Sequence, residues 1–233
     1  MLRESISKLT STILTYSDPA TSLIQPQTIR DNRIAFIGCS PRSGSTMLIR
    51  ILDSHSKISA PCEIAFPKYF RRDWKRKTVN EKYKQICDYY SANFYLCKGN
   101  PQHLFQKIRR KEKKKSVVIK EPRQSLFLDK IYQDFADFKL IHLVRDARSV
   151  AMSPWFINNP KRGLEIWYRY NKSVLEVADN LKPSHKLIVR YEDLVEDTST
   201  AIKKVVEFLG YAFEPKMLNY GKFKHADDEM LPR

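Results

Sequence analysis

A short polar loop near the start of the chain carries the residues best suited to chemistry. It reads Cys-Ser-Pro-Arg-Ser-Gly-Ser-Thr over residues 39–46 and joins an apolar run at 33–38 to a helical pattern at 47–55. Where a buried strand turns into a helix, the first N–H groups have no intrahelical partner, and the helix dipole favours negative charge. Arg42 adds a cation beside the loop hydroxyls. The loop therefore predicts a site for a phosphate or a similar anion.

A second segment of the same kind lies at 144–153, Val-Arg-Asp-Ala-Arg-Ser-Val-Ala-Met-Ser, where another apolar run leads into a helical pattern. If the helix begins near Asp146, Ser149 and Ser153 share one face at a spacing of four residues. A guanidinium from Arg145 with a hydroxyl would form a clamp for a second phosphate. The alternative is that the Arg-Asp pair is a salt-bridged helix start.

The loop at 39–46 is not a Walker A sequence, because no Gly-Lys-Ser/Thr follows a Gly-x-x-x-x spacer. The missing lysine disfavours a nucleoside triphosphate with Mg²⁺ as its ligand. Taken alone, the loop could also be a Gly/Ser turn that caps a helix.

Five segments in order resemble the sulfotransferases that use 3′-phosphoadenosine 5′-phosphosulfate (PAPS). They are Pro-Arg-Ser-Gly-Ser-Thr at 41–46, Ala-Pro-Cys-Glu at 60–63, Val-Ile-Lys-Glu-Pro-Arg at 118–123, Val-Arg-Asp-x-Arg-x-x-x-x-Ser at 144–153, and Val-Arg-Tyr-Glu-Asp-Leu at 189–194. The resemblance covers residues 33–215. It is closest to the tyrosylprotein and bacterial branch, whose first loop carries arginine where cytosolic small-molecule enzymes carry lysine.

The resemblance implies a set of donor-binding residues. They are Arg42, Ser43, Gly44, Ser45, Thr46, Arg145, Ser153 and Tyr191. The loop amides and the hydroxyls of Ser45 and Thr46 would hold the 5′-phosphosulfate, with Arg42 against the bridging and sulfuryl oxygens. The pair Arg145 and Ser153 would bind the 3′-phosphate. The aromatic ring of Tyr191 would lie near the adenine.

Three residues are expected to carry the reaction: Arg42, Glu63 and Lys120. Fixed cations stabilise the charge that builds on the leaving phosphate, and an acceptor hydroxyl needs a nearby base. By resemblance, Glu63 falls where the tyrosylprotein branch carries its base, and Lys120 matches a lysine near the transferred group. The alternative for Glu63 is a surface or salt-bridged glutamate. Among the histidines, His103 is the alternative base, whereas His142 lies in an apolar run and is expected in the core.

Composition favours a globular protein that meets anionic partners. The net charge is +16, and the segments 68–77 and 107–115 hold much of it. Such a field attracts nucleotides, acidic peptides, acidic glycans, nucleic acid or anionic lipid, although two solvated helix faces would look the same. The four cysteines show no metal-ligand spacing and are expected to be reduced thiols. No metal is expected, because arginine and lysine supply the charge.

The chain alternates between strand and helix patterns. Strands are expected at 33–39, 58–61, 116–121, 139–144 and 186–191. Helices are expected at 45–55, 79–93, 103–111, 125–135, 147–155, 163–181 and 198–209. This alternation predicts an α/β protein with three α/β/α layers around a central parallel sheet. The resemblance implies the P-loop-NTPase-like sulfotransferase fold, with an N-terminal helix and lead-in at 1–32 and the sulfotransferase domain at 33–233.

The ends of the chain and its hydropathy bear on location. No stretch near the N-terminus has the apolar core of a signal peptide, and no window approaches a membrane span. A cytoplasmic protein is expected. The alternative is a lumenal Golgi fragment without its anchor.

We therefore expect a sulfotransferase that moves a sulfuryl group from PAPS to a hydroxyl acceptor, releasing adenosine 3′,5′-bisphosphate. The acceptor is a glycan, a peptide tyrosine or a small molecule; an acidic glycan or peptide suits the basic residues at 61–76, and no specific nucleic acid is expected. The alternatives are an ATP/Mg²⁺ P-loop phosphotransferase and a non-catalytic polyanion-binding protein on the same scaffold. The sequence leaves open the acceptor and the oligomeric state. Trp155 is expected to pack between helices, with an acceptor role as the weaker alternative.

Overall fold

The structure is a computed structural model that describes residues 31, 33–69, 76–135, 137–226 and 228. The short helix expected within residues 1–32 lies outside these ranges, and the domain boundary at residue 33 stays a prediction. None of the helices in these ranges has both the length and the apolar character needed to cross a membrane.

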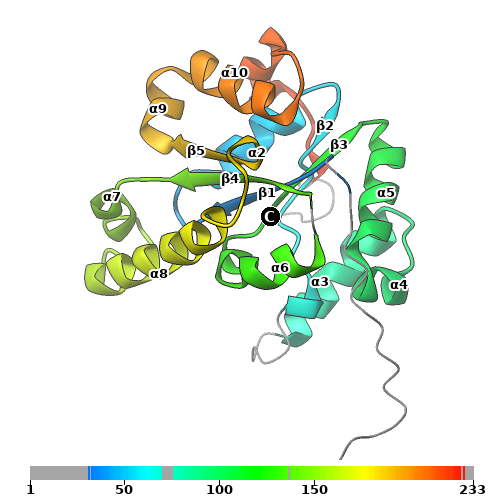
Figure 1. The fold of residues 1–233 in the computed structure, drawn as a ribbon, viewed down its shortest axis with the longest axis horizontal. Helices are drawn as coiled ribbons and strands as arrows, with labels where there is room; N and C mark the ends of the chain where they lie inside the picture. The colour runs from blue at the N-terminus through cyan, green and yellow to red at the C-terminus, as the bar shows by residue number, and fades with distance from the viewer. Residues whose placement is uncertain (1–30, 32, 70–75, 136, 227, 229–233) are drawn as a thin grey trace, which may run out of the picture.

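A five-stranded parallel sheet forms the centre of the molecule (Figure 1). Its strands are β1 (Ile34–Cys39), β2 (Ile58–Ser59), β3 (Ser116–Lys120), β4 (Lys139–Val144) and β5 (Lys186–Arg190), in the spatial order β2-β3-β1-β4-β5. All five predicted strands are confirmed. Every residue of the central strand β1 is buried, as expected for a strand covered on both faces.

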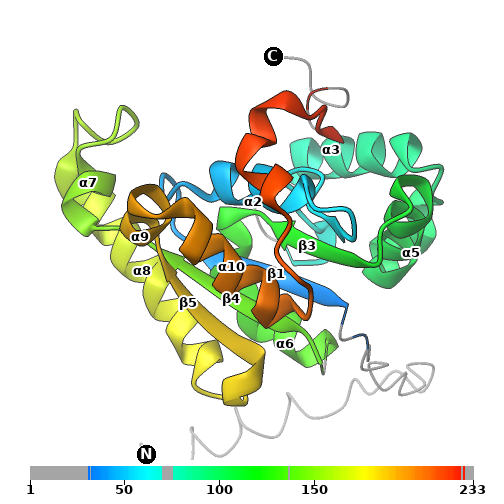
Figure 2. The ribbon, with the colours of Figure 1, turned by 90° about the horizontal axis from the view of Figure 1, so that it is seen from above.

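Helices cover both faces of the sheet. They are α2 (Ser45–Asp53), α3 (Arg76–Tyr89), α4 (Phe94–Gly99), α5 (Pro101–Glu112), α6 (Leu128–Asp134), α7 (Ala147–Ala151), α8 (Pro160–Ala178), α9 (Tyr191–Glu196) and α10 (Thr198–Leu209). Short 3₁₀ helices lie at η1 (Pro67–Tyr69), η2 (Pro122–Phe127), η3 (Pro183–His185) and η4 (Pro215–Lys222). Figure 1 shows α2, α9 and α10 above the sheet and α6 and α8 below it, and Figure 2 looks onto the sheet from the side of α2 and α10.

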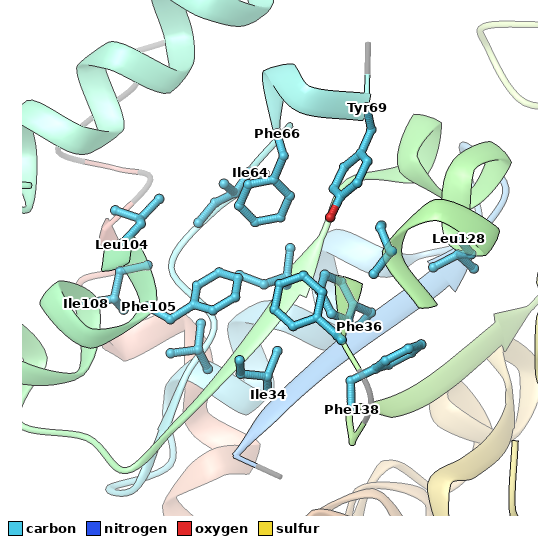
Figure 3. Close-up of a cluster of buried hydrophobic side chains, with 14 of the residues drawn as sticks. Ile34, Phe36, Ile64, Phe66, Tyr69, Leu104, Phe105, Ile108, Leu128 and Phe138 are labelled. Atoms are coloured by element: carbon cyan, nitrogen blue, oxygen red, sulfur yellow. The ribbon is translucent and has the colours of Figure 1, made fainter. Parts of the chain in front are cut away.

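Alternate residues of β1 enter two separate cores. Ile34 and Phe36 pack with side chains from α3, α5, α6 and α8, whereas Ala35 and Ile37 pack with α2 and α10. Figure 3 shows Phe36 in the first core, where its ring centroid lies 5.2 Å from that of Phe138. The period of two along a strand thus produces the predicted α/β/α layers. The four cysteines are buried and form no disulfide within the described part of the chain.

Some helix boundaries differ from the sequence prediction. The helix expected at 147–155 ends at Ala151, and Pro154 disfavours helical backbone at the residue before it. The segment expected as one helix at 103–111 is preceded by a separate helix, α4, because Asn93 and Asn100 each cap a new helix start. The short helix α9 was not predicted, since it follows β5 with no intervening loop.

The C-terminal end of α2 is anchored by Asp53. Its buried carboxylate accepts hydrogen bonds from the Ala60 amide at 3.0 Å and the Lys114 ammonium at 2.8 Å, and it lies 2.9 Å from Nδ1 of His225. These contacts join α2 to the ends of β2 and β3 and to the C-terminal segment. They fix the axis of the helix whose other end carries the polar loop.

This anchor predicts a pH-dependent stability. The hydrogen bond to Asp53 raises the pKa of His225 above 6.5. Its contribution is therefore fully present below about pH 6.5 and is lost as the pH rises through the raised value. We expect the thermal midpoint to fall over that range, and His225→Gln to flatten the fall. His185→Gln is the matched control, and an equal pH profile for wild type and His225→Gln would contradict the assignment.

Candidate functional site

The polar loop between β1 and α2 is closed by its own hydroxyls. Ser40 and Ser43 are fully buried and share a hydrogen bond of 2.8 Å. The hydroxyl of Ser125 accepts from the Cys39 amide and donates to the Cys39 carbonyl, both at 3.0 Å. The hydroxyl of Ser43 is therefore engaged in a hydrogen bond within the loop.

The start of α2 is open to an anion. Gly44 stands before the helix with φ 85° and makes no side-chain cap, and the first turn holds no acidic residue. Such a start leaves the first amides, from Ser45 onward, without intrahelical partners. A Cβ atom at Gly44 would lie 2.2 Å from the ring of Tyr191, so glycine is required both for the positive φ and for the close ring.

Arg145 connects the second predicted segment to the loop. Its Nη1 donates to the carbonyl of Arg42 at 3.0 Å, and its Cζ lies 4.3 Å from the ring centroid of Tyr191. The indole of Trp167 donates to the Arg145 carbonyl at 2.8 Å. Arg145 Nε is buried and has no hydrogen-bond partner within the described part of the chain. The helix start is salt-bridged through Arg148 instead, whose guanidinium lies 2.9 Å from the Asp146 carboxylate.

Ser153 is placed differently from the sequence prediction. Because α7 ends at Ala151, Ser149 is exposed while Ser153 is buried in the following turn, so the predicted shared helical face is wrong. The hydroxyl of Ser153 has no partner among the described residues. Burying a hydroxyl without a hydrogen-bond partner costs free energy. An oxygen atom of a bound ligand would supply the missing partner.

Lys120 and Glu63 come together beside the loop. Lys120 is only 2% exposed, and its ammonium donates to Glu63 and, at 3.3 Å, to the hydroxyl of Thr46. The two residues also pair as a parallel backbone bridge, and the Ile64 amide donates to the Lys120 carbonyl. One buried cation therefore contacts both the anion loop and a half-exposed carboxylate.

Glu121 is a second carboxylate that the sequence analysis did not single out, although it follows Lys120 in the same motif. One of its oxygens accepts from Nε of Arg123 at 3.0 Å, and the other is buried without a partner in the described chain. Burial raises the pKa of Glu121, the cation of Arg123 opposes the shift, and the negative charge of Glu63 adds to it.

A cavity of about 840 Å³ joins these groups. The predicted site residues that line it are Arg42, Gly44, Ser45, Thr46, Glu63, Lys120, Arg145 and Tyr191. Ser43 and Ser153 are not among the lining residues. The helix α3 also lines the cavity, through Thr78, Val79, Lys82, Tyr83 and Ile86. The spacing of these residues predicted a helix, but nothing in the sequence indicated that this face of the helix lies near the loop at 39–46.

Trp155 was expected to pack between helices, and that prediction is wrong. Its side chain is 70% exposed and lines the cavity, with the Cζ atom of Arg42 at 5.5 Å from its ring centroid. A cation over an indole ring is an attractive contact. The ring therefore helps to hold the loop arginine at the mouth of the cavity.

The histidines lie elsewhere. His142 is buried in β4, where its Nε2 is 2.8 Å from Oδ1 of Asn171, and burial lowers its pKa. That prediction of a core histidine is confirmed. Its Nδ1 is buried without a partner in the described chain. His103 lies on α5, and no histidine is found among the described residues that line the cavity.

The residues present fit an anion with charge at two places. The open start of α2, the Lys120 ammonium and Arg42 offer donors at one place. The unpartnered Nε of Arg145 offers a donor at another, and the buried hydroxyl of Ser153 offers a further group in the same segment of the chain. These are the donor types that phosphate oxygens take up.

Comparisons with known proteins agree on one family. The sequence profile of the sulfotransferase family matches residues 35–215. A Caenorhabditis briggsae protein that carries the name of a protein-tyrosine sulfotransferase is 21% identical over 215 residues, which is 85% of this chain and 72% of that protein.

Two solved structures share the fold. The sulfotransferase domain of the Synechococcus PCC 7002 olefin synthase has a TM-score of 0.70 at 24% identity, covering 88% of this chain and 82% of that one. The sulfotransferase domain of the curacin biosynthetic pathway has a TM-score of 0.67 at 24% identity, covering 85% and 81%.

The position of Arg145 predicts a role in binding the nucleotide. We expect Arg145→Ala to weaken the binding of adenosine 3′,5′-bisphosphate by about 1.5–3 kcal/mol, as for a lost charged hydrogen bond. Titration calorimetry measures this change. Arg148→Ala is the matched control, since it removes an exposed arginine three residues away. Equal affinities for wild type and Arg145→Ala would refute the role.

Proposed function

The chain belongs to the sulfotransferase family, and on that premise we propose that it transfers a sulfuryl group from PAPS to a hydroxyl acceptor. Adenosine 3′,5′-bisphosphate is the released product. The observation that carries the proposal is the position of Lys120, whose ammonium contacts both Thr46 of the anion loop and the Glu63 carboxylate. One buried cation links a site for a departing phosphate to a group that accepts a proton.

The donor end of the site would work by charge. PAPS supplies a sulfuryl group already activated on a phosphate leaving group. The amides at the start of α2 are oriented before reaction, and Arg42 stands beside them on the Trp155 ring. Fixed dipoles and cations of this kind stabilise charge that develops in the transition state more than charge already present in the ground state.

The acceptor end would work by proton removal. As the acceptor oxygen forms its bond to sulfur, the bond from sulfur to the leaving phosphate oxygen breaks, and that oxygen keeps the electron pair. The proton of the acceptor hydroxyl passes to Glu63. The hydrogen bond from Lys120 orients the Glu63 carboxylate toward the loop, so base and donor site stay at a fixed separation.

Two further cations that line the cavity support an acidic acceptor. They are Lys82 of α3 and Arg123 of η2, in addition to the cations assigned to the donor. A glycan or peptide with negative charge near its hydroxyl group would be attracted to them.

A cytoplasmic location stays a prediction from the sequence.

Two measurements test the proposal. Titration with adenosine 3′,5′-bisphosphate reports the donor site, and transfer of radiolabelled sulfate from PAPS to a panel of sugars, peptides and phenols reports the reaction. The absence of both binding and transfer would overturn it. Mg²⁺-dependent turnover of ATP would favour the phosphotransferase alternative, and salt-sensitive polyanion binding unchanged by Arg42→Ala would favour a binding protein.

Glu63 gives the sharpest variant. We expect Glu63→Gln to lower kcat by roughly 10²–10⁴-fold, the usual contribution of a general base, while bisphosphate affinity stays within about twofold of wild type because the amide preserves the shape of the side chain. Glu165→Gln, an exposed glutamate on α8, is the control. A large loss of bisphosphate affinity in Glu63→Gln would instead mark Glu63 as a structural partner of Lys120.

A further inference from the structure

The loop between α7 and α8 exposes large apolar side chains to water. Met152 is 57% exposed, Trp155 70% and Ile157 52%. Of the thirteen exposed large hydrophobic residues in the described chain, five fall within 152–168. Single exposed apolar residues are ordinary on a protein surface, but a concentration of them marks an interaction surface.

The direction of these side chains is set by hydrogen bonds and packing. The amides of Phe156 and Ile157 both donate to the Ser153 carbonyl at 2.9 Å, which closes a tight turn. Phe156 is buried, and its Cβ would lie 2.9 Å from a Cβ atom added at Gly163 of α8. Because Phe156 is anchored inward, its neighbours on the turn are held outward.

Basic residues flank the loop. The segment 147–164 contains Arg148, Lys161 and Arg162 and no aspartate or glutamate, while Asp146 and Glu165 lie just outside it. All three basic residues are exposed. Arg148 is paired with Asp146, so Lys161 and Arg162 are the cations that matter for an anionic partner. Figure 2 shows α7 and the loop that follows it at the edge of the molecule, beyond the strands of the sheet.

We propose that the 152–157 loop docks on the surface of a membrane that contains anionic lipid. A projecting apolar tip with tryptophan beside cations is the combination that binds the boundary between headgroups and acyl chains, where the indole ring is favoured and basic residues meet lipid phosphate. An acidic protein surface would satisfy the cations but would not need the apolar tip.

The position of Trp155 connects this surface to the candidate site. The same indole lines the cavity and lies beside Arg42. Docking through the loop would therefore bring the mouth of the cavity to the layer of lipid headgroups. The inference does not depend on sulfuryl transfer, since vesicle binding is measured without turnover.

Cosedimentation with vesicles tests the docking. We expect binding to phosphatidylcholine vesicles that contain phosphatidylglycerol and much weaker binding to phosphatidylcholine alone. The double variant Met152→Ser/Ile157→Ser keeps the net charge and should lower partitioning by about tenfold or more, because it removes two apolar side chains that would enter the lipid layer. The control is Tyr95→Ser/Leu96→Ser on α4, two exposed apolar residues on the opposite side of the molecule (Figure 1).

A second measurement tests the docking in case the Met152→Ser/Ile157→Ser variant does not fold. Brominated lipid should quench tryptophan fluorescence in the wild type, and Trp155→Phe should lose most of that quenching. The proposal is overturned if the protein does not bind anionic vesicles, if the α4 variant loses as much binding as the loop variant, or if quenching persists unchanged in Trp155→Phe.

Discussion

A buried ammonium is the constraint on which the candidate site depends. Lys120 ends β3 in the interior, and an unpaired charge there would cost several kcal/mol. The cost is offset because Glu63 and Thr46 both come to the ammonium. The chain after β2 therefore lies beside Lys120, where Glu63 and Lys120 form a parallel backbone bridge. The same contacts place a carboxylate next to the anion loop.

The helix α2 is held at both ends for different reasons. At its C-terminal end Asp53 binds three separate parts of the chain, so the axis is fixed by satisfied buried polar groups. At its N-terminal end the amides are left without a side-chain cap, and the neighbouring Arg145 and Ser153 keep polar atoms that no described residue satisfies. The stabilising contacts of α2 are thus concentrated at the end away from the cavity. The polar groups without hydrogen-bond partners in the described chain lie at the end that faces the cavity.

Much of the fold and part of the site could be predicted from local patterns. The apolar runs predicted the positions of all five strands. The motifs at the carboxyl ends of these strands pointed to Arg42, Glu63, Lys120 and Arg145, and all four residues line one cavity. The shared helical face of Ser149 and Ser153 was wrong, because it assumed that the helix continued past the residue before Pro154. Helical periodicity gives no information about where a helix stops.

The sequence by itself determined the layers of the protein and the anion loop, because burial of period-two strands and an uncapped helix start are local consequences of residue order. Only the tertiary structure decided which groups meet. It joined Arg145 to the Arg42 carbonyl, left Trp155 exposed beside Arg42, and brought one face of α3 to the cavity that the loop lines. Those outcomes depend on contacts between residues far apart in the chain, and one sequence carries no direct record of such contacts.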